Sequence, residues 1–220
     1  MFLPIYIYFE LLSLLFALWF YKGLRKFKLS PFILVLLTGC LADVAGGKLS
    51  DLKISNYYIY NGYLIISTPL YFYAFFKMLN YTGLTKKLYI IISMLVVVFI
   101  SLNLFFIQGY KEFNTYSLII IEFVITLLSL LVLLKLFNDN DTTIMLQQHP
   151  YFWISGSTLI FSISTLAILG LQQFIQTNNL QLDGKNIYRI LIPMLNIILS
   201  GCYIYAFSLC HKLTSKLLPQ

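Results

Sequence analysis

Three acidic residues stand inside apolar stretches of this sequence, namely Glu10, Asp43 and Glu122. A charged group at membrane depth costs roughly 2.5–3.5 kcal/mol, so each is expected to face a partner or a hydrated cavity. Other apolar stretches hold polar residues that can share a site with them, namely Asn61, Arg189 and Asn196. A single arginine can pair with one carboxylate, which leaves the others to be hydrated, protonated or bound to a ligand. These six residues therefore predict a binding site for a small polar or cationic ligand.

The same residues give little support for catalysis. The sequence has no Ser-His-Asp set and no cluster with metal-ligand spacing, and Cys40, Cys202 and Cys210 all fall in apolar stretches. We therefore expect no metal and no cofactor. The segment Thr38-Gly-Cys-Leu-Ala-Asp43 resembles the second-helix aspartate region of membrane lysoplasmalogenases. Asp43 with Glu10 or Glu122 as an acid/base pair would make a membrane-embedded lipid hydrolase, which is a remote alternative.

The composition places these residues in a membrane. Of the 220 residues, 60% are hydrophobic and only 10% are charged, whereas soluble domains keep about a quarter of their residues charged. The net charge of +7 comes from residues that flank the apolar stretches, where they can face anionic lipid. The predicted partner of the basic residues is therefore the bilayer and not a nucleic acid.

The apolar stretches divide the chain into seven predicted transmembrane helices, which form one all-α domain over residues 1–220. The second is the shortest, because Gly46-Gly47 is expected to end it. The predicted spans are residues 3–21, 31–46, 57–79, 88–108, 117–137, 151–174 and 187–210.

The distribution of basic residues predicts the orientation of the spans. Ten of the fifteen lysines and arginines fall on the side of the C-terminus, and five on the side of the N-terminus. Cytoplasmic loops carry the excess of basic residues. We therefore expect a multi-pass protein of the cell membrane with the N-terminus outside and the C-terminus in the cytoplasm.

With this orientation, the polar residues of the spans gather in the outer half of the bundle. The inner half holds no ionisable group except Lys77 and Lys135, which can extend to the cytoplasmic surface. Pro69 and Pro193 lie within spans and are candidate hinges, and Pro193 frees the carbonyl group of Arg189 from its helical hydrogen bond. Tyr57, Tyr58, Tyr60 and Tyr63 either wall an outer pocket or form an aromatic belt at the membrane interface.

Three similarities suggest an internal repeat with halves at residues 1–80 and 115–213, joined by the span at residues 88–108. Tyr71-Phe-Tyr-Ala-Phe75 matches Tyr203-Ile-Tyr-Ala-Phe207, the second and sixth spans both open on a proline and an aromatic residue, and the first and fifth spans both carry a glutamate. This 3+1+3 parallel arrangement resembles the architecture of the seven-helix sugar transporters built from two triple-helix bundles. The sequence has no Pro-Gln motif within a span.

Two functions fit this organisation. An outward-facing site above an apolar inner half favours a sensor, or an accessory to a signalling partner that contacts the basic inner loops. Intramembrane carboxylates, two mid-span prolines and a possible repeat favour a small secondary transporter instead, coupled to protons through Glu10 or Glu122. The sequence predicts the same site for both functions. We expect sensing, with transport as the alternative.

Overall fold

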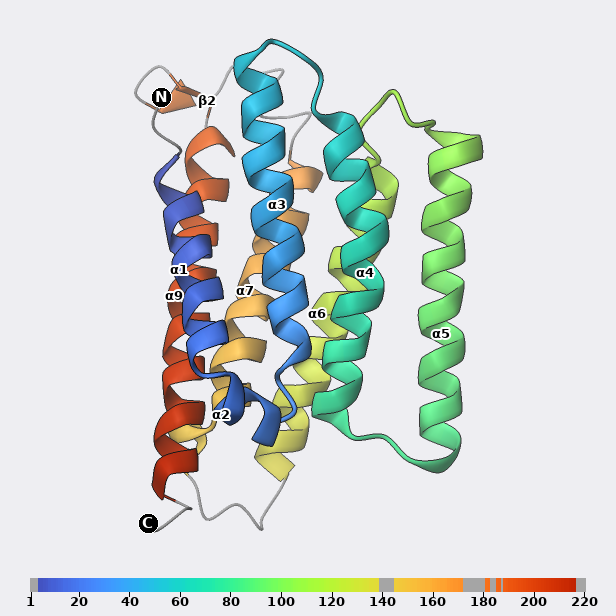
Figure 1. The fold of residues 1–220 in the computed structure, drawn as a ribbon. Coiled ribbons are helices and arrows are strands. Elements are labelled where there is room, and N and C mark those ends of the chain that lie inside the picture. The colour runs from blue at the N-terminus through green and yellow to red at the C-terminus, as the bar shows by residue number, and fades with distance from the viewer. Residues whose placement is uncertain (1–3, 139–144, 172–180, 183–184, 187, 217–220) are drawn as a thin grey trace.

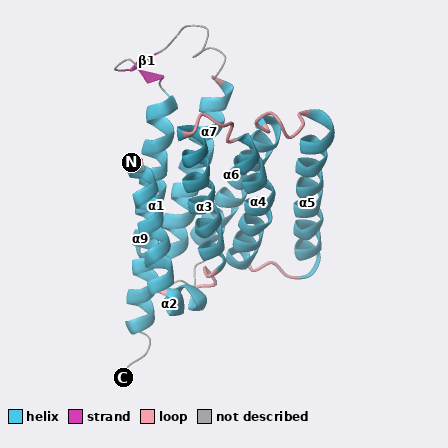
Figure 2. Cartoon of the chain, turned by 45° about the horizontal axis from the view of Figure 1, so that its top comes forward, coloured by secondary structure: helices cyan, strands magenta, loops and turns pink. Residues whose placement is uncertain are grey.

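The computed structural model describes residues 4–138, 145–171, 181–182, 185–186 and 188–216 (Figure 1). These residues form helices almost throughout, with a two-residue antiparallel pair of strands, β1 (Gln181–Leu182) and β2 (Lys185–Asn186), beyond one end of the bundle (Figure 2). The helices are α1 (Ile5–Trp19), α2 (Tyr21–Lys26), α3 (Pro31–Asp51), α4 (Tyr57–Leu79), α5 (Gly83–Leu102), α6 (Thr115–Asn138), α7 (Pro150–Gly170) and α9 (Tyr188–Lys216).

The helix ends follow from local chemistry. Pro31 and Pro150 stand at the first turns of α3 and α7, where the missing N–H group is not needed. The backbone N–H of Tyr151 donates to the His149 side chain before α7. α4 ends at Asn80, whose φ of 52° is the left-handed conformation common at helix C-termini. α5 continues into a π-helical turn, Asn103–Ile107.

Within the described residues, five helices are long and apolar enough to cross a membrane: α3, α5 with its π-helical turn, α6, α7 and residues Ile190–Ser215 of α9. α1 is apolar but shorter. α4 has sufficient length, and its many tyrosines lower its mean hydropathy. The described chain is therefore an all-α fold of the kind found in multi-pass membrane proteins.

Several helices differ in extent from the sequence prediction. α3 does not end at Gly46 but continues to Asp51. A Cβ atom at Gly46 would lie 2.9 Å from the Tyr60 ring, so the glycine gives the ring space and does not end the helix. α1 ends at Trp19, and the separate helix α2 follows it. α5 begins at Gly83 rather than at residue 88, and α9 runs beyond residue 210 to Lys216.

Six of the described helices form a closed ring. Going round it, α1 contacts α3, α3 contacts α4, α4 contacts α6, α6 contacts α7, α7 contacts α9, and α9 returns to α1 (Figure 1). α5 stands outside this ring, packed mainly against α4, and most of its side chains face away from the bundle. The ring leaves a central space that side chains fill only at one end.

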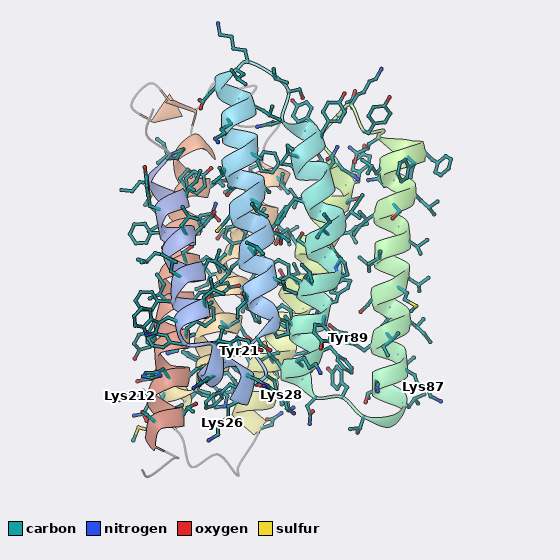
Figure 3. All side chains as sticks on the ribbon, viewed as in Figure 1. Tyr21, Lys26, Lys28, Lys87, Tyr89 and Lys212 are labelled. Carbon is teal, nitrogen blue, oxygen red and sulfur yellow. The ribbon has the colours of Figure 1, made fainter. Side chains whose placement is uncertain are left out.

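The packed end is the one where the C-terminus lies. Phe32, Phe75 and Phe207 are fully buried there, and the Phe32 ring centroid lies 5.7 Å from that of Tyr203 and 6.5 Å from that of Tyr71. Such edge-to-face aromatic contacts stabilise a core beyond simple burial. Basic side chains surround the same end, including the labelled Lys26, Lys28, Lys87 and Lys212 (Figure 3).

Candidate ligand-binding cavity

A cavity of about 430 Å³ lies between the six ring helices, and its lining extends from Glu10 and Asp43 to Val35 and Tyr203. Each ring helix contributes to its wall, and Phe113 joins them from the loop between α5 and α6. This volume falls within the roughly 300–1,000 Å³ that is usual for sites of small ligands. The aromatic core below Tyr71 and Tyr203 closes the cavity toward the C-terminal end.

The structure brings four of the six predicted site residues to this cavity. Glu10, Asp43, Glu122 and Asn196 line it, as does the predicted hinge Pro193. The others do not line the cavity or lie outside the described residues. Asn61 is buried outside the lining and Pro69 is exposed on α4, whereas the side chain of Arg189 lies outside the described residues.

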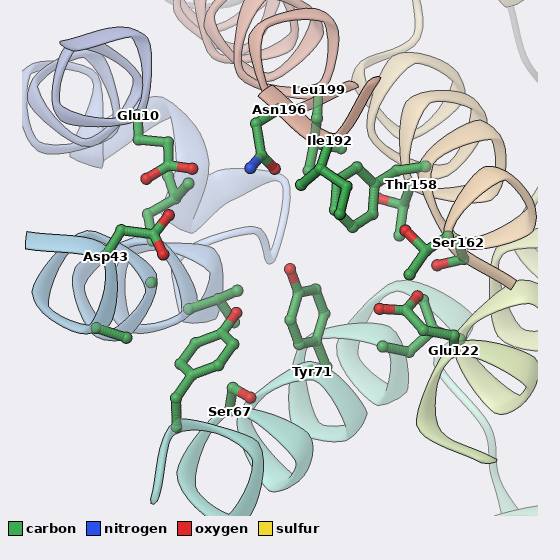
Figure 4. A pocket seen from close by; sticks show the side chains of 18 of the residues that line it. Glu10, Asp43, Ser67, Tyr71, Glu122, Thr158, Ser162, Ile192, Asn196 and Leu199 are labelled. Atoms are coloured by element: carbon green, nitrogen blue, oxygen red, sulfur yellow. The ribbon is translucent and has the colours of Figure 1, made fainter. Parts of the chain in front are cut away.

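Glu10 and Asp43 form an acidic pair on one side of the cavity. Their carboxyl groups point toward each other from α1 and α3 and interact directly (Figure 4). The Oε2 atom of Glu10 is buried without a hydrogen-bond partner among the described residues. The Tyr60 side chain approaches Asp43 from α4, and Gly46 provides the space for its ring. The pair thus has capacity to accept hydrogen bonds from a ligand.

Glu122 stands on the opposite side, on α6. Only 8% of the residue is exposed, and its carboxyl group lies beside the Ser162 hydroxyl group of α7 (Figure 4). Ser162 is 1% exposed, and its Oγ atom makes no hydrogen bond within the described chain. Buried polar groups are nearly always hydrogen-bonded in proteins. The Ser162 hydroxyl group has the Glu122 carboxyl group as its nearest polar neighbour, and this carboxyl group can accept hydrogen bonds from a ligand in the cavity.

Tyrosine hydroxyl groups form the floor of the cavity. Tyr71 of α4 points its hydroxyl group into the centre (Figure 4) and interacts with Tyr203 of α9. The Tyr203 hydroxyl group lies 2.8 Å from that of Thr158 in α7, which in turn donates to the Ile154 carbonyl. This chain of hydroxyl groups joins three ring helices at mid-depth.

The charge balance of the lining indicates which ligand it can hold. Among the described lining residues there are three carboxyl groups and no lysine, arginine or histidine. The remaining polar groups are hydroxyl groups and the Asn196 amide, which can accept or donate hydrogen bonds. Aromatic faces, which attract cations, come from the tyrosines. The cavity is thus suited to a small cation with hydrogen-bond donors.

Asn61 holds the loop at the mouth of the cavity. Its side chain accepts from the Asn114 backbone N–H at 3.0 Å and donates to the Glu112 carbonyl at 2.8 Å. Asn103, at the start of the π-helical turn, donates to Asn114 and to Ser117. This buried network fixes the loop that carries Phe113 over the cavity.

Sequence reasoning missed much of the lining, although a signal was present. It considered Tyr60 and Tyr63 as pocket residues, and both line the cavity, whereas Tyr57 and Tyr58 are exposed. Steps of three and four residues mark one face of a helix, and the missed polar lining residues follow such steps from those recognised: Tyr6 before Glu10, and Ser67 and Tyr71 after Tyr63. Ser200 and Tyr203, which the same spacing predicts on the face of Asn196, also line the cavity. The same spacing joins Thr158, Ser162 and Thr165 in α7.

No protein-family model matches the chain, and neither the curated proteins nor the solved structures include a significant match to it. Its function is therefore inferred from the cavity itself.

Proposed function

We propose that the chain is an integral membrane protein of seven spans whose cavity binds a small cationic ligand from the outer side. One observation carries this proposal: three carboxyl groups line a buried cavity in which the described lining has no cationic side chain. Burying charge in this way is costly unless a partner neutralises it. A bound cation supplies that partner.

The seven spans follow if α1 and α4 cross the membrane beside the five apolar helices. Both belong to the closed ring and run alongside helices long enough to span (Figure 1). The basic residues at the C-terminal end support an orientation with that end in the cytoplasm. The cavity then opens toward the outside.

Sensing is the function that this geometry favours. Under the tyrosine floor, buried aromatic side chains pack the described bundle toward its cytoplasmic end, so a bound ligand would meet packed side chains on an inward route. A sensor needs a relay, and the basic inner loops at residues 22–28 and 77–87 offer a contact surface for a signalling partner.

A secondary transporter is the alternative, and the possible internal repeat favours it. The two matched motifs have matching environments: Ala74, Phe75, Ala206 and Phe207 are fully buried, and Tyr73 and Tyr205 are 49% and 48% exposed. The ring order also fits two halves, α1–α3–α4 and α6–α7–α9, that meet twice. Transporters built from repeats bind substrate where the halves meet.

Accessibility of introduced cysteines in intact cells tests these functions. The three native cysteines are first replaced, and Glu10→Cys, Glu122→Cys and Ser200→Cys are then labelled separately with a membrane-impermeant thiol reagent. A dead-ended binding cavity predicts labelling from outside at the first two positions and protection of both by a bound amine. Labelling of Ser200→Cys from the cytoplasmic side would establish a through-path and favour transport. No labelling at Glu10→Cys or Glu122→Cys would contradict an outward-facing cavity.

A further inference from the structure

The acidic groups of the cavity occupy corresponding places in the two halves of the ring. Glu10 and Glu122 lie on α1 and α6, the first ring helices of each half. Asp43 follows Pro31 by twelve residues in α3, and Ser162 follows Pro150 by twelve residues in α7. Tyr71 and Tyr203 head the two matched motifs. All of these side chains line the one cavity.

Each half therefore builds a similar polar site. In one half the glutamate of the first helix faces Asp43 of the second, and in the other half it lies beside Ser162 (Figure 4). We name these the Glu10 half-site (Glu10 and Asp43) and the Glu122 half-site (Glu122 and Ser162). They stand on opposite sides of the cavity, with the Tyr71 hydroxyl group between them (Figure 4).

Both half-sites contain buried groups that lack a partner. At the Glu122 half-site, the Ser162 hydroxyl group is unbonded although the residue is only 1% exposed. At the Glu10 half-site, the Oε2 atom of Glu10 is unbonded and buried. Leaving such groups without a hydrogen-bond partner destabilises the empty cavity. A ligand that satisfies only one side would leave this cost at the other.

The lining between the half-sites suits an uncharged chain. Ile192 and Leu199 of α9 face the space there with Asn196, and Tyr71 faces it from the other wall (Figure 4). The described lining holds no cation that could neutralise either half-site. The arrangement is acidic at both ends, and between them apolar side chains stand beside the Tyr71 hydroxyl group and the Asn196 amide.

We propose that the ligand is a linear aliphatic amine with a cationic group at each end, one in each half-site. This inference rests on the proposed function, because it requires that the cavity binds cations at all. It adds that two ammonium groups bind at once, with the methylene chain lying along Ile192, Leu199 and Tyr71.

Binding of a matched set of amines to the purified full-length protein in lipid nanodiscs tests the proposal. The probes are butylamine, the diamines diaminopropane, putrescine and cadaverine, and uncharged butanediol, each measured by calorimetry and by the shift in melting temperature. The expected result is that the best diamine binds at least about tenfold more tightly than butylamine, while butanediol does not bind.

A charge-neutralising variant identifies the second contact. Glu122→Gln keeps the size of the side chain and removes its charge, so it should abolish the advantage of the diamine over butylamine. The matched control is Glu112→Gln, which removes an exposed carboxylate near the same end of the bundle but outside the cavity. This control should retain the full diamine advantage.

The possible failures are distinguishable. Equal affinity for butylamine and all three diamines would overturn the two-ended ligand while the proposed cation-binding function stands. Loss of the diamine advantage in Glu112→Gln as well would mean that general surface charge causes it, which also overturns the inference. If no amine binds to the wild-type protein, the proposed function itself fails. The comparison of butylamine with the diamines is made in the wild-type protein, so its result does not depend on whether a variant folds.

Discussion

The Tyr203 hydroxyl group lies 2.8 Å from the Thr158 hydroxyl group, and it also interacts with Tyr71. This contact is where α4, α7 and α9 meet at the floor of the cavity. Below it, Phe32 packs edge-on against both tyrosine rings. The floor is therefore held by hydroxyl contacts on one side and by aromatic packing on the other.

Removing the Tyr203 hydroxyl group should loosen this floor without emptying the core. In Tyr203→Phe, Thr158 retains its bond to the Ile154 carbonyl, whereas Tyr71 loses a buried partner, so we expect unfolding to become easier by about 0.5–1.5 kcal/mol. Thermal unfolding in nanodiscs measures the change. Tyr205→Phe is the matched control, because Tyr205 is 48% exposed. An equal loss in both variants would contradict the role of the floor.

Neutralising one member of the acidic pair should stabilise the empty protein and weaken ligand binding. Two carboxyl groups in contact repel each other when both are ionised. Asp43→Asn keeps the shape of the side chain. We expect it to raise the stability of the ligand-free protein by about 0.5–2 kcal/mol and to lower its affinity for the ligand. Melting curves with and without putrescine measure both effects. Asp51→Asn, at the exposed end of α3, should change neither, and a less stable Asp43→Asn protein would contradict the repulsion.

Gly46 and Gly47 should respond in opposite ways to substitution by alanine. A Cβ atom at Gly46 would lie 2.9 Å from the Tyr60 ring, whereas one at Gly47 would meet nothing within 4 Å. Gly46→Ala should therefore destabilise the protein by about 1–3 kcal/mol through overpacking. Gly47→Ala should stabilise α3 by about 0.5–1 kcal/mol, because alanine favours helix. The melting temperatures of the two variants measure these effects. Similar values would contradict the close packing of the Tyr60 ring against Gly46.

Asn61→Ala should release the loop that carries Phe113. The variant leaves the Asn114 N–H group and the Glu112 carbonyl without their side-chain partner, at a cost of about 1–3 kcal/mol. Trypsin should then cut faster after Lys111, which lies exposed in that loop. Cleavage after Lys53, in the α3–α4 loop, serves as the internal control. Unchanged cutting at Lys111 would show that the loop is held by other contacts.

The sequence predicted the helical regions well where length and apolar character agree. The range predicted for 57–79 coincides with α4, because Asn80 in the left-handed conformation ends it. It failed where tertiary contacts override local preference: Gly46-Gly47 reads as a helix end, yet the Tyr60 ring packs against Gly46 and α3 continues. Such a contact depends on a residue in another helix, so no local pattern contains it.

For the cavity, the buried acids were the informative signal. Glu10, Asp43 and Glu122 were identified by the cost of charge in an apolar stretch, and all three line the cavity. Asn61 carried the same signal but bonds to a loop instead. The amide side chain of an asparagine can form hydrogen bonds to a ligand or to backbone groups equally well. The residue type alone therefore does not predict which of the two Asn61 binds.

The position of α5 outside the ring has a consequence for how the polypeptide is threaded. After three helices, the chain is at the opposite end of the bundle from where it started. A second set of three helices can run in the same direction as the first only if one further helix returns the chain to the starting end. α5 makes that passage, from the end where α4 finishes to the end where α6 begins (Figure 1). The sequence of α5 is then constrained by helix length and apolar character more than by close packing against other helices. Two fragments of the chain, divided near Gly83 or Gly109 and expressed together, are expected to reassemble.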